Sequence, residues 1–255
     1  MKLRNLLYGI YQKNLERLLF AEPSHIPHHI GVILDGNRRW AKSVGENVSF
    51  GHQKGADKVF ELLDWCGRFD VKVVTLWMLS TDNLKRTSQE LSGLFEIIVN
   101  TVERIANSRK WKIRIVGALE LLPENVVNRL MKAQNDTDHI TGIEVNIAVG
   151  YGGRQEILDA FKSYMSANQN EGTSYEDALA SLSIENIDEH LYTAGQPHPD
   201  LVIRTSGEQR LSGFLLWQSA QSEFYFCETY WPSFRYVDFL RALRDYAQRD
   251  RRMGK

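Results

Sequence analysis

Short apolar runs rich in β-branched residues alternate with longer segments of helical period along most of the chain. Six such runs predict β-strands, at residues 30–34, 71–79, 112–116, 143–149, 201–203 and 223–227. The clearest helical segment is 88–106, where apolar residues recur every third or fourth position. Thr87 and Glu90 at its start fit a capping box. Strands that alternate with helices predict a single α/β domain with a mostly parallel central sheet flanked by helices.

An N-terminal amphipathic helix precedes this domain. Its apolar positions over residues 2–20 are Leu3, Leu6, Leu7, Ile10, Leu15, Leu18 and Leu19. Pro23 and Pro27 end it, so residues 1–26 form a helix with a linker and 27–255 form the α/β domain. Such a stripe fits a peripheral contact with a membrane surface or packing on its own domain. The second outcome is the commoner one, and we favour it.

Composition narrows the class of protein. The 255 residues include 31 Lys+Arg and 32 Asp+Glu, a formal net charge of −1 that argues against nucleic acid as a partner. Two cysteines exclude a disulfide framework. No apolar run approaches the roughly 20 residues of a membrane span, and charged residues interrupt the N-terminal segment where a signal peptide would be apolar. These features predict a soluble cytoplasmic protein.

Arginines and small polar residues follow several predicted strands. Because ligands of open α/β sheets bind beyond the carboxyl ends of the strands, these segments are candidates for a binding site. Guanidinium groups together with Gly, Ser, Thr and Asn donors suit polyphosphate oxygens. A single arginine is usually just solvated surface, but a cluster at strand ends favours an anionic ligand. The arginines concerned are Arg38, Arg39, Arg86, Arg204 and Arg210.

Two residues at the strand ends suggest further chemistry. Asp35 stands directly after the first strand, where a carboxylate either holds Mg²⁺ together with substrate phosphates or caps a helix; the position alone leaves both open. Asn83 is suited to orient a substrate by hydrogen bonding, since an amide is a poor proton acceptor. No GxxxxGK[ST] motif occurs, which argues against a P-loop NTPase.

Four segments together resemble the cis-prenyltransferases, the Z-isoprenyl diphosphate synthases that include undecaprenyl diphosphate synthase, and more narrowly the short-chain Z,E-farnesyl diphosphate synthases of actinobacteria. They are VILDGNRRWA at 32–41, GHQKGA at 51–56, LSTDN at 79–83 with Arg86, and DLVIRTSGE at 200–208 with FLLWQ at 214–218 and Glu223. The resemblance extends over about residues 27–254. Four blocks in the same order are far more specific than any single short motif.

The resemblance implies a Mg²⁺-dependent homodimer that condenses an allylic diphosphate with isopentenyl diphosphate and releases pyrophosphate. It implies that Asp35 and Glu223 bind the metal and that Asp35 and Asn83 are the catalytic residues. It assigns the allylic diphosphate to Gly36, Asn37, Arg38, Arg39 and His52. It places Ser80 and Arg86 at the reacting ends and assigns isopentenyl diphosphate to Arg204, Arg210 and Ser212. The remaining expected substrate contacts are Trp40, Thr81, Asp82 and Leu211. Arg252, Met253 and Gly254 resemble an element that reaches the neighbouring subunit.

The chain departs from the family pattern at several positions. Val48 replaces an arginine of many long-chain members, Leu84 replaces a tryptophan, and Gln209 replaces a histidine near the metal. Met78 stands where long-chain members carry a small alanine, so a methionine pointing into the tunnel would stop elongation early. Strand alternation leaves the alternative that Met78 faces the other way. We favour the short product, (2Z,6E)-farnesyl diphosphate made from geranyl diphosphate.

Three other functions fit less well. A long-chain polyprenyl diphosphate synthase shares the chemistry and differs only in tunnel length. A non-catalytic partner subunit of a heteromeric prenyltransferase would lack the metal-binding aspartate, whereas Asp35 is present. An aspartate-nucleophile phosphatase requires a second carboxylate two residues after the first, where this chain has Asn37.

Overall fold

The computed structural model describes residues 2–249 and contains all six predicted strands, with boundaries that agree within two residues. The strands are β1 (His29–Ile33), β2 (Val73–Ser80), β3 (Lys112–Val116), β4 (Glu144–Tyr151), β5 (Leu201–Arg204) and β6 (Glu223–Phe226). They form one sheet in the order β3-β4-β2-β1-β5-β6, and each neighbouring pair is parallel. The predicted α/β class is therefore confirmed.

The order of the strands locates the expected ligand site. From β1 the chain crosses to β2 on one side and later returns to β5 on the other. The loops that follow β1 and β5 thus diverge, and such a switch point opens a crevice at the carboxyl edge of a parallel sheet. Asp35 follows β1, Ser80 ends β2 and Arg204 ends β5, so the topology brings the predicted segments to one edge.

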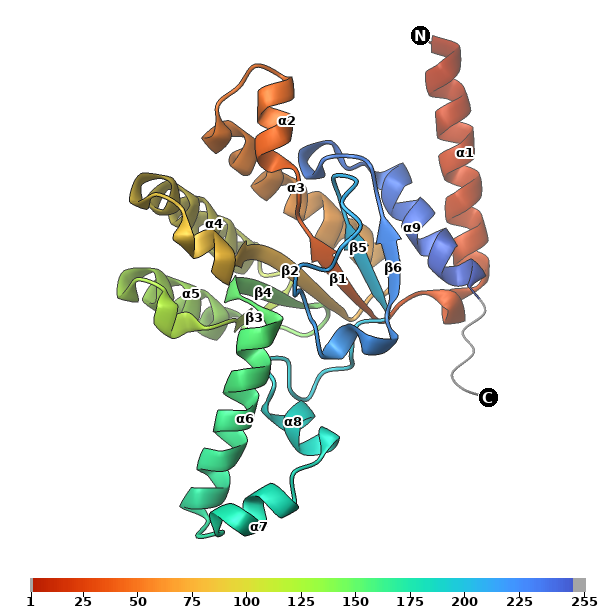
Figure 1. Ribbon diagram of the computed structural model, residues 1–255. Coiled ribbons are helices and arrows are strands. Elements are labelled where there is room, and N and C mark those ends of the chain that lie inside the picture. The colour runs from red at the N-terminus through yellow and green to blue at the C-terminus, as the bar shows by residue number, and fades with distance from the viewer. Residues whose placement is uncertain (1, 250–255) are drawn as a thin grey trace.

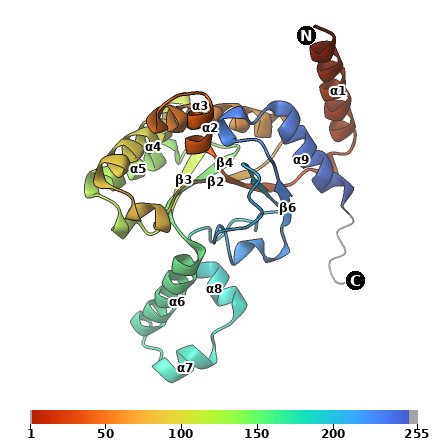
Figure 2. The same cartoon turned by 45° about the horizontal axis from the view of Figure 1, so that its top comes forward.

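The helices are distributed unevenly around the sheet (Figure 1). They are α1 (Lys2–Ala21), α2 (Asn37–Ser43), α3 (Val48–Arg68), α4 (Ser88–Ser108), α5 (Glu124–Thr137), α6 (Gly153–Asn170), α7 (Tyr175–Ala180), α8 (Ile184–His190) and α9 (Tyr236–Gln248). Apolar residues of α3, α4, α5 and α9 form the main core on one face. Phe214 and Leu215 of the loop before β6 pack on the other face, while α6, α7 and α8 project away from the sheet (Figure 2).

Helix α1 lies against α9 (Figure 2). Leu15 and Leu19 are buried in the main core, and the Tyr236 hydroxyl donates to Glu16 at 2.6 Å. The favoured prediction, that this helix packs on its own domain, is confirmed for these residues; the side chains of Leu3, Leu6 and Leu7 lie outside the described ones. Over the described part of the chain, no helix combines the length and apolar character needed to cross a bilayer.

A buried polar network fixes the start of β1. The Asp200 carboxylate accepts hydrogen bonds from the backbone N–H groups of His28 and His29, at 2.7 and 3.0 Å. The His29 ring is bonded to the Thr75 hydroxyl at 2.8 Å and to the Pro197 carbonyl at 2.7 Å. Burial lowers the pKa of His29 to about 4, so this ring is neutral at physiological pH.

Candidate active site

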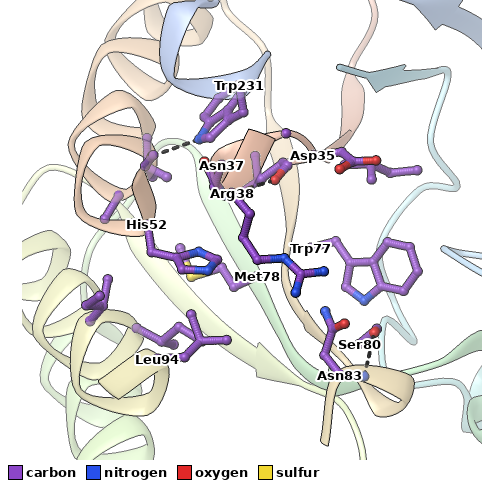
Figure 3. Close-up of a pocket in the computed structure, with 18 of the residues that line it drawn as sticks. Asp35, Asn37, Arg38, His52, Trp77, Met78, Ser80, Asn83, Leu94 and Trp231 are labelled. Atoms are coloured by element: carbon purple, nitrogen blue, oxygen red, sulfur yellow. Dashed lines mark hydrogen bonds between the residues drawn. The ribbon is translucent and has the colours of Figure 1, made fainter. Parts of the chain in front are cut away.

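A cavity of about 570 Å³ opens at the carboxyl edge of β1, β2 and β5 (Figure 3). Its volume is in the range of small-molecule sites. The outer part is charged and the inner part is apolar. The residues predicted for substrate or metal that line it are Asp35, Gly36, Asn37, Arg38, Arg39, His52, Ser80, Asn83, Arg86, Arg204, Arg210 and Ser212.

Two arginines meet the Asp35 carboxylate. Arg204 donates to Oδ2 at 2.9 Å, and Arg39 donates to Oδ1 at 3.3 Å. Burial would by itself raise the pKa of Asp35, but the hydrogen bonds and the two positive charges outweigh it and lower this pKa. The carboxylate is therefore ionised at neutral pH. Its backbone is also fixed, because the Thr205 hydroxyl donates to the Asp35 carbonyl at 2.7 Å.

The loop after β5 places donors around Arg204. This guanidinium is buried and donates to the Ser212 hydroxyl at 2.8 Å and to the Arg210 carbonyl, while its Nε–H has no hydrogen-bond partner among residues 2–249. Gly207 has φ +76°, a left-handed conformation that glycine adopts without strain. The loop therefore curls back so that Ser212 and Arg210 face the end of β1.

Asn37 begins α2 and is held by an unusually close approach of α3. A Cβ atom on Gly51 would lie 2.4 Å from the Asn37 carbonyl oxygen, and one on Gly55 would lie 2.3 Å from Asn37 Oδ1. Gly36, with φ +107°, makes the turn from β1 into α2. The two glycines of the 51–56 segment thus let a helix pack directly on the diphosphate-binding loop predicted at 36–39.

Asn83 and Arg86 form a connected group after β2. The Ser80 hydroxyl accepts from the Asn83 N–H at 3.1 Å, and Arg86 donates to Asn83 Oδ1 at 3.0 Å. Arg86 also donates to Glu90 at 2.9 Å, at the start of α4. The amide is held at its oxygen, so its NH₂ group is the part that can meet a substrate.

His52 extends from α3 into the same cavity (Figure 3). Burial, together with the nearby positive charge of Arg86, lowers its pKa to about 4. The ring is therefore neutral near pH 7, and its buried Nε2 atom lacks a hydrogen-bond partner within the part of the chain that the structure describes. A neutral imidazole with one free ring nitrogen can donate to or accept from a bound ligand.

The inner part of the cavity is lined by apolar side chains of α3, α4 and β2. They are Ala56, Val59, Met78, Leu94, Ile97 and Ile98, with Thr101 beside them. Thr101 donates its hydroxyl to the Ile97 carbonyl at 2.6 Å, so it presents little polarity to the cavity. A charged mouth above an apolar channel suits a ligand with a diphosphate head and a hydrocarbon tail.

Met78 lies on the cavity side of the sheet. It lines the cavity, packs against the main core and lies beside His52 in Figure 3. Trp77 packs on the opposite face, stacked on Phe214. The sheet is irregular at this point: Trp77 is opposite Ala148 and Leu79 is opposite Val149, so Met78 is the extra residue of a β-bulge. The orientation that a tunnel plug requires is therefore present.

Five predicted site residues do not line the cavity. Trp40 stacks on Phe50, with 6.0 Å between ring centroids, and Leu211 packs against the smaller core cluster around Phe214. Thr81 lies against Gly152, and the exposed Asp82 pairs with Lys85 at 2.9 Å. These four residues shape the surroundings of the site within one chain. The fifth is Glu223.

Within a single chain, Glu223 lies too far from Asp35 for both carboxylates to bind the same metal ion. It is the first residue of β6 and lies opposite Leu201, the first residue of β5, whereas the site lies beyond Arg204 at the other end. Three strand residues separate the two ends by about 10 Å. Glu223 is ion-paired with Arg249 instead. The expectation that it joins Asp35 is therefore wrong for one chain.

The three departures from the family pattern lie around the cavity without lining it. Val48 and Gln209 are exposed, and Leu84 packs against the main core. Sequence reasoning missed Trp231, whose N–H groups fix two parts of the site: its backbone donates to the Asp35 carbonyl at 3.0 Å and its ring to the Gly55 carbonyl at 2.8 Å. No spacing signal in the sequence marks this residue.

Two carboxylates line the cavity, Asp35 and Glu208, and Glu208 is ion-paired with Arg39 at 3.2 Å and with Arg210. Among residues 2–249 no group of three or more His, Cys, Asp or Glu side chains could hold a metal ion. Asp35 is ionised, lines the cavity and has side chains around it that can donate hydrogen bonds to a diphosphate. Mg²⁺ is commonly held by one or two carboxylates plus substrate phosphates. The donor set therefore fits a cation that arrives with a diphosphate.

The chain belongs to the undecaprenyl diphosphate synthase family of prenyltransferases, whose family profile matches residues 33–254. Over 253 residues it is 55% identical to a (2Z,6E)-farnesyl diphosphate synthase of Thermobifida fusca, and the alignment covers 99% of this chain and 98% of the relative. It is 53% identical to isoprenyl transferase 1 of Streptomyces avermitilis, and that alignment covers 99% of this chain and 97% of the relative. The fold matches lavandulyl diphosphate synthase from Lavandula x intermedia in complex with dimethylallyl diphosphate, with TM-score 0.83, 32% identity and coverage of 91% and 100%.

Proposed function

We propose that this protein is a Mg²⁺-dependent short-chain cis-prenyltransferase that condenses geranyl diphosphate with isopentenyl diphosphate to (2Z,6E)-farnesyl diphosphate. The observation that supports the short product is the position of Met78, which lines the apolar part of the cavity and packs against the main core. Relatives that cover nearly the whole chain and are named for this product support the same assignment.

In the reaction, the C1–O bond of the allylic diphosphate breaks and its electron pair leaves with pyrophosphate. A new bond joins C1 to C4 of isopentenyl diphosphate, whose C2 loses a proton to form the Z double bond. Bound Mg²⁺, held by Asp35 and diphosphate oxygens, would neutralise charge on the departing group. The positive side chains at the mouth of the cavity stabilise the same negative charge on the departing pyrophosphate.

The residues of the chain divide between the two substrates. Gly36, Asn37, Arg38 and Arg39 at the start of α2 bind the allylic diphosphate, with His52 beside them. Arg204, Arg210 and Ser212, which are bonded to one another, bind isopentenyl diphosphate. Asn83, held by Ser80 and Arg86, orients the reacting ends.

We also propose that the protein is a cytoplasmic homodimer. Apolar side chains of α6, α7 and α8 remain exposed, among them Leu158 (47%) and Ile184 (65%), and they border a groove beside Trp217. Light scattering after gel filtration tests the dimer, and Ile184→Asp should shift it toward monomer. Arg252, Met253 and Gly254, the element expected to reach a neighbouring subunit, lie outside the described residues.

Flotation with vesicles tests the peripheral membrane contact of α1.

Product analysis tests the function directly. Purified protein is incubated with Mg²⁺, labelled isopentenyl diphosphate and either geranyl or E,E-farnesyl diphosphate, and the products are separated by chain length. We expect one fifteen-carbon product from geranyl diphosphate. A ladder ending near fifty carbons would make the protein a long-chain synthase. No product from either starter, with folded protein, would indicate a partner subunit of a heteromeric enzyme.

A further inference from the structure

The loop between β5 and β6 contains a strained backbone turn next to the site. Ser212 and Leu215 have φ values of +53° and +44°, and Gly213 between them has φ +88°. Side chains other than that of glycine seldom occupy this left-handed region, so such a turn persists only where its surroundings fix it. Ser212 accepts a hydrogen bond from Arg204 at 2.8 Å and stands at the start of the turn. Its position therefore depends on contacts that hold the turn from outside.

The start of α6 packs against the middle of this turn. Gly153 donates its backbone N–H to the Gly213 carbonyl at 2.8 Å, and a Cβ atom on Gly153 would lie 2.5 Å from Leu216 Cβ. Phe214, inside the turn, is fully buried and stacks on Trp77 with 5.2 Å between the ring centroids. These contacts hold the middle of the turn against α6 and the sheet.

Gln218 holds the end of the turn with a buried amide. Its Nε2 group donates to Glu156 Oε1 at 2.9 Å and to the Thr193 hydroxyl at 3.0 Å, and the residue is only 2% exposed. Its Oε1 atom has no partner among residues 2–249, so the amide is held by its nitrogen alone. The Ser219 N–H donates to the Leu215 carbonyl at 2.8 Å, which closes the chain around Gln218 into the same turn.

Glu156 gives this amide a fixed acceptor. It lies fully buried in α6 and also accepts from the Tyr151 hydroxyl at the end of β4 and from the Tyr192 backbone N–H at 3.1 Å. One carboxylate thus joins β4, the segment after α8 and the loop before β6. Partners in a buried hydrogen-bond network restrain one another. The proposed chemistry does not use this pair, and neither Glu156 nor Gln218 lines the cavity.

We propose that Gln218, anchored on Glu156, is a positioning residue for isopentenyl diphosphate; this rests on the proposed function of the site. The amide holds the end of the strained turn whose start presents Ser212 to Arg204. Without it, the turn can relax toward negative φ values, and Ser212 moves away from the guanidinium. The predicted allylic contacts at 36–39 are not part of this turn, so the loss falls on one of the two substrates.

The test compares Gln218→Met with Gln221→Met. Methionine keeps an unbranched side chain and removes the amide, and Gln221 is exposed in the same short helical turn, Gln218–Gln221. Initial rates with one substrate varied and the other saturating give the two KM values separately. In Gln218→Met we expect KM for isopentenyl diphosphate to rise about tenfold, with kcat and KM for geranyl diphosphate within about twofold of wild type. Gln221→Met should change none of them.

Two results would overturn the positioning role. One is an unchanged KM for isopentenyl diphosphate in a folded Gln218→Met enzyme. The other is an equal rise in both KM values, which indicates a general loss of packing. If Gln218→Met does not fold, Thr193→Val replaces it. Valine has the shape of threonine and removes one of the two acceptors of the amide, so the same change should appear to a smaller extent.

A binding measurement separates this proposal from the proposed function. Isopentenyl diphosphate is titrated calorimetrically into protein that holds Mg²⁺ and an unreactive thio analogue of geranyl diphosphate. We expect binding about tenfold weaker in Gln218→Met than in the wild type, and equal binding of the analogue itself. Equal binding of isopentenyl diphosphate overturns the role of Gln218. A wild type that makes no product overturns the proposed function alone, because the titrations still decide the role of Gln218.

Discussion

The proposed short product depends on the side chain of one methionine, Met78. Strict alternation along β2 puts Met78 on the same face as Val74 and Leu76, and all three contact the main core. Leu79, which strict alternation would send to the opposite face, packs in the same core cluster as Met78. The bulge therefore changes the orientation of Leu79, whereas Met78 keeps the one that regular alternation gives it.

Met78→Ala should lengthen the product. Removing the side chain extends the channel between α3 and α4, so we expect products of twenty or more carbons to exceed the fifteen-carbon product in chromatography of the reaction mixture. Met131→Ala is the matched control, because Met131 packs against the same core without lining the cavity. A fifteen-carbon product from a folded Met78→Ala enzyme would show that the channel ends elsewhere.

Asp35→Asn should reduce turnover about a hundredfold or more while the protein still folds. The amide keeps the size of the side chain but removes the anion that pairs with Arg204 and that would hold Mg²⁺. Initial rates at saturating substrates and Mg²⁺, together with a thermal melt, measure both effects. Retention of most of the wild-type rate would remove Asp35 from the catalytic machinery.

At the scale of the elements, the sequence predicts individual strands and helix ends, but it does not predict contacts that form only when two separate elements pack closely together. Each strand and the Thr87 N-cap of α4 were readable from short patterns: Thr87 accepts from the Glu90 N–H, although the Glu90 carboxylate accepts from Arg86 and not from the Thr87 backbone. The reason for Gly51 and Gly55 was not readable from any pattern. It lies in the contact between α3 and the turn at Asn37, which forms only when two separate elements meet.

Gly55→Ala should therefore damage the site through packing. Its Cβ atom would collide with Asn37 Oδ1, so α3 or the diphosphate loop must shift, and we expect KM for the allylic diphosphate to rise about tenfold. Gly93→Ala is the control, because nothing lies within 4 Å of the added atom in α4. That substitution should leave KM unchanged and stabilise the fold by about 0.5–1 kcal/mol. Equal KM values for both variants would contradict this account of Gly55.

At the scale of the whole molecule, the parallel sheet decides which predicted residues meet. Asp35, Ser80 and Arg204 come together because each stands at or just after the carboxyl end of its strand. Glu223 was assigned to the metal from resemblance, yet its own pattern makes it the first residue of a strand. A parallel sheet sends the first and last residues of its strands to opposite edges, which separates Glu223 from Asp35.

The whole molecule should also lose stability in mild acid. Above pH 6.5 His29 is neutral whether the chain is folded or unfolded, so it has no effect. Below this value the unfolded chain binds a proton, whereas the folded chain, with a pKa of about 4, does not. Between pH 7 and 5 we expect His29 to reduce the free energy of unfolding by about 2 kcal/mol. His52, with the same lowered pKa, acts in the same direction.

Denaturant unfolding at several pH values measures this slope. His29→Gln removes one titrating group, so the loss of stability between pH 7 and 5 should become about 2 kcal/mol smaller in that variant. A slope equal to that of the wild type would mean that the ring already binds its proton in the folded chain.

The bulge at Met78 also limits the mutational routes by which product length can change. One position further along, β4 contains an extra residue of its own, Gly150, and the pairing returns to register where Ser80 meets Tyr151. The two irregularities compensate each other. Loss of residue 78 would remove one irregularity and leave Gly150 as an uncompensated extra residue of β4. A deletion here would thus disturb the pairing of β2 with β4 beside the site, whereas a substitution at 78 leaves that pairing intact, so we expect variants of different product length to differ at this position by substitution and not by deletion.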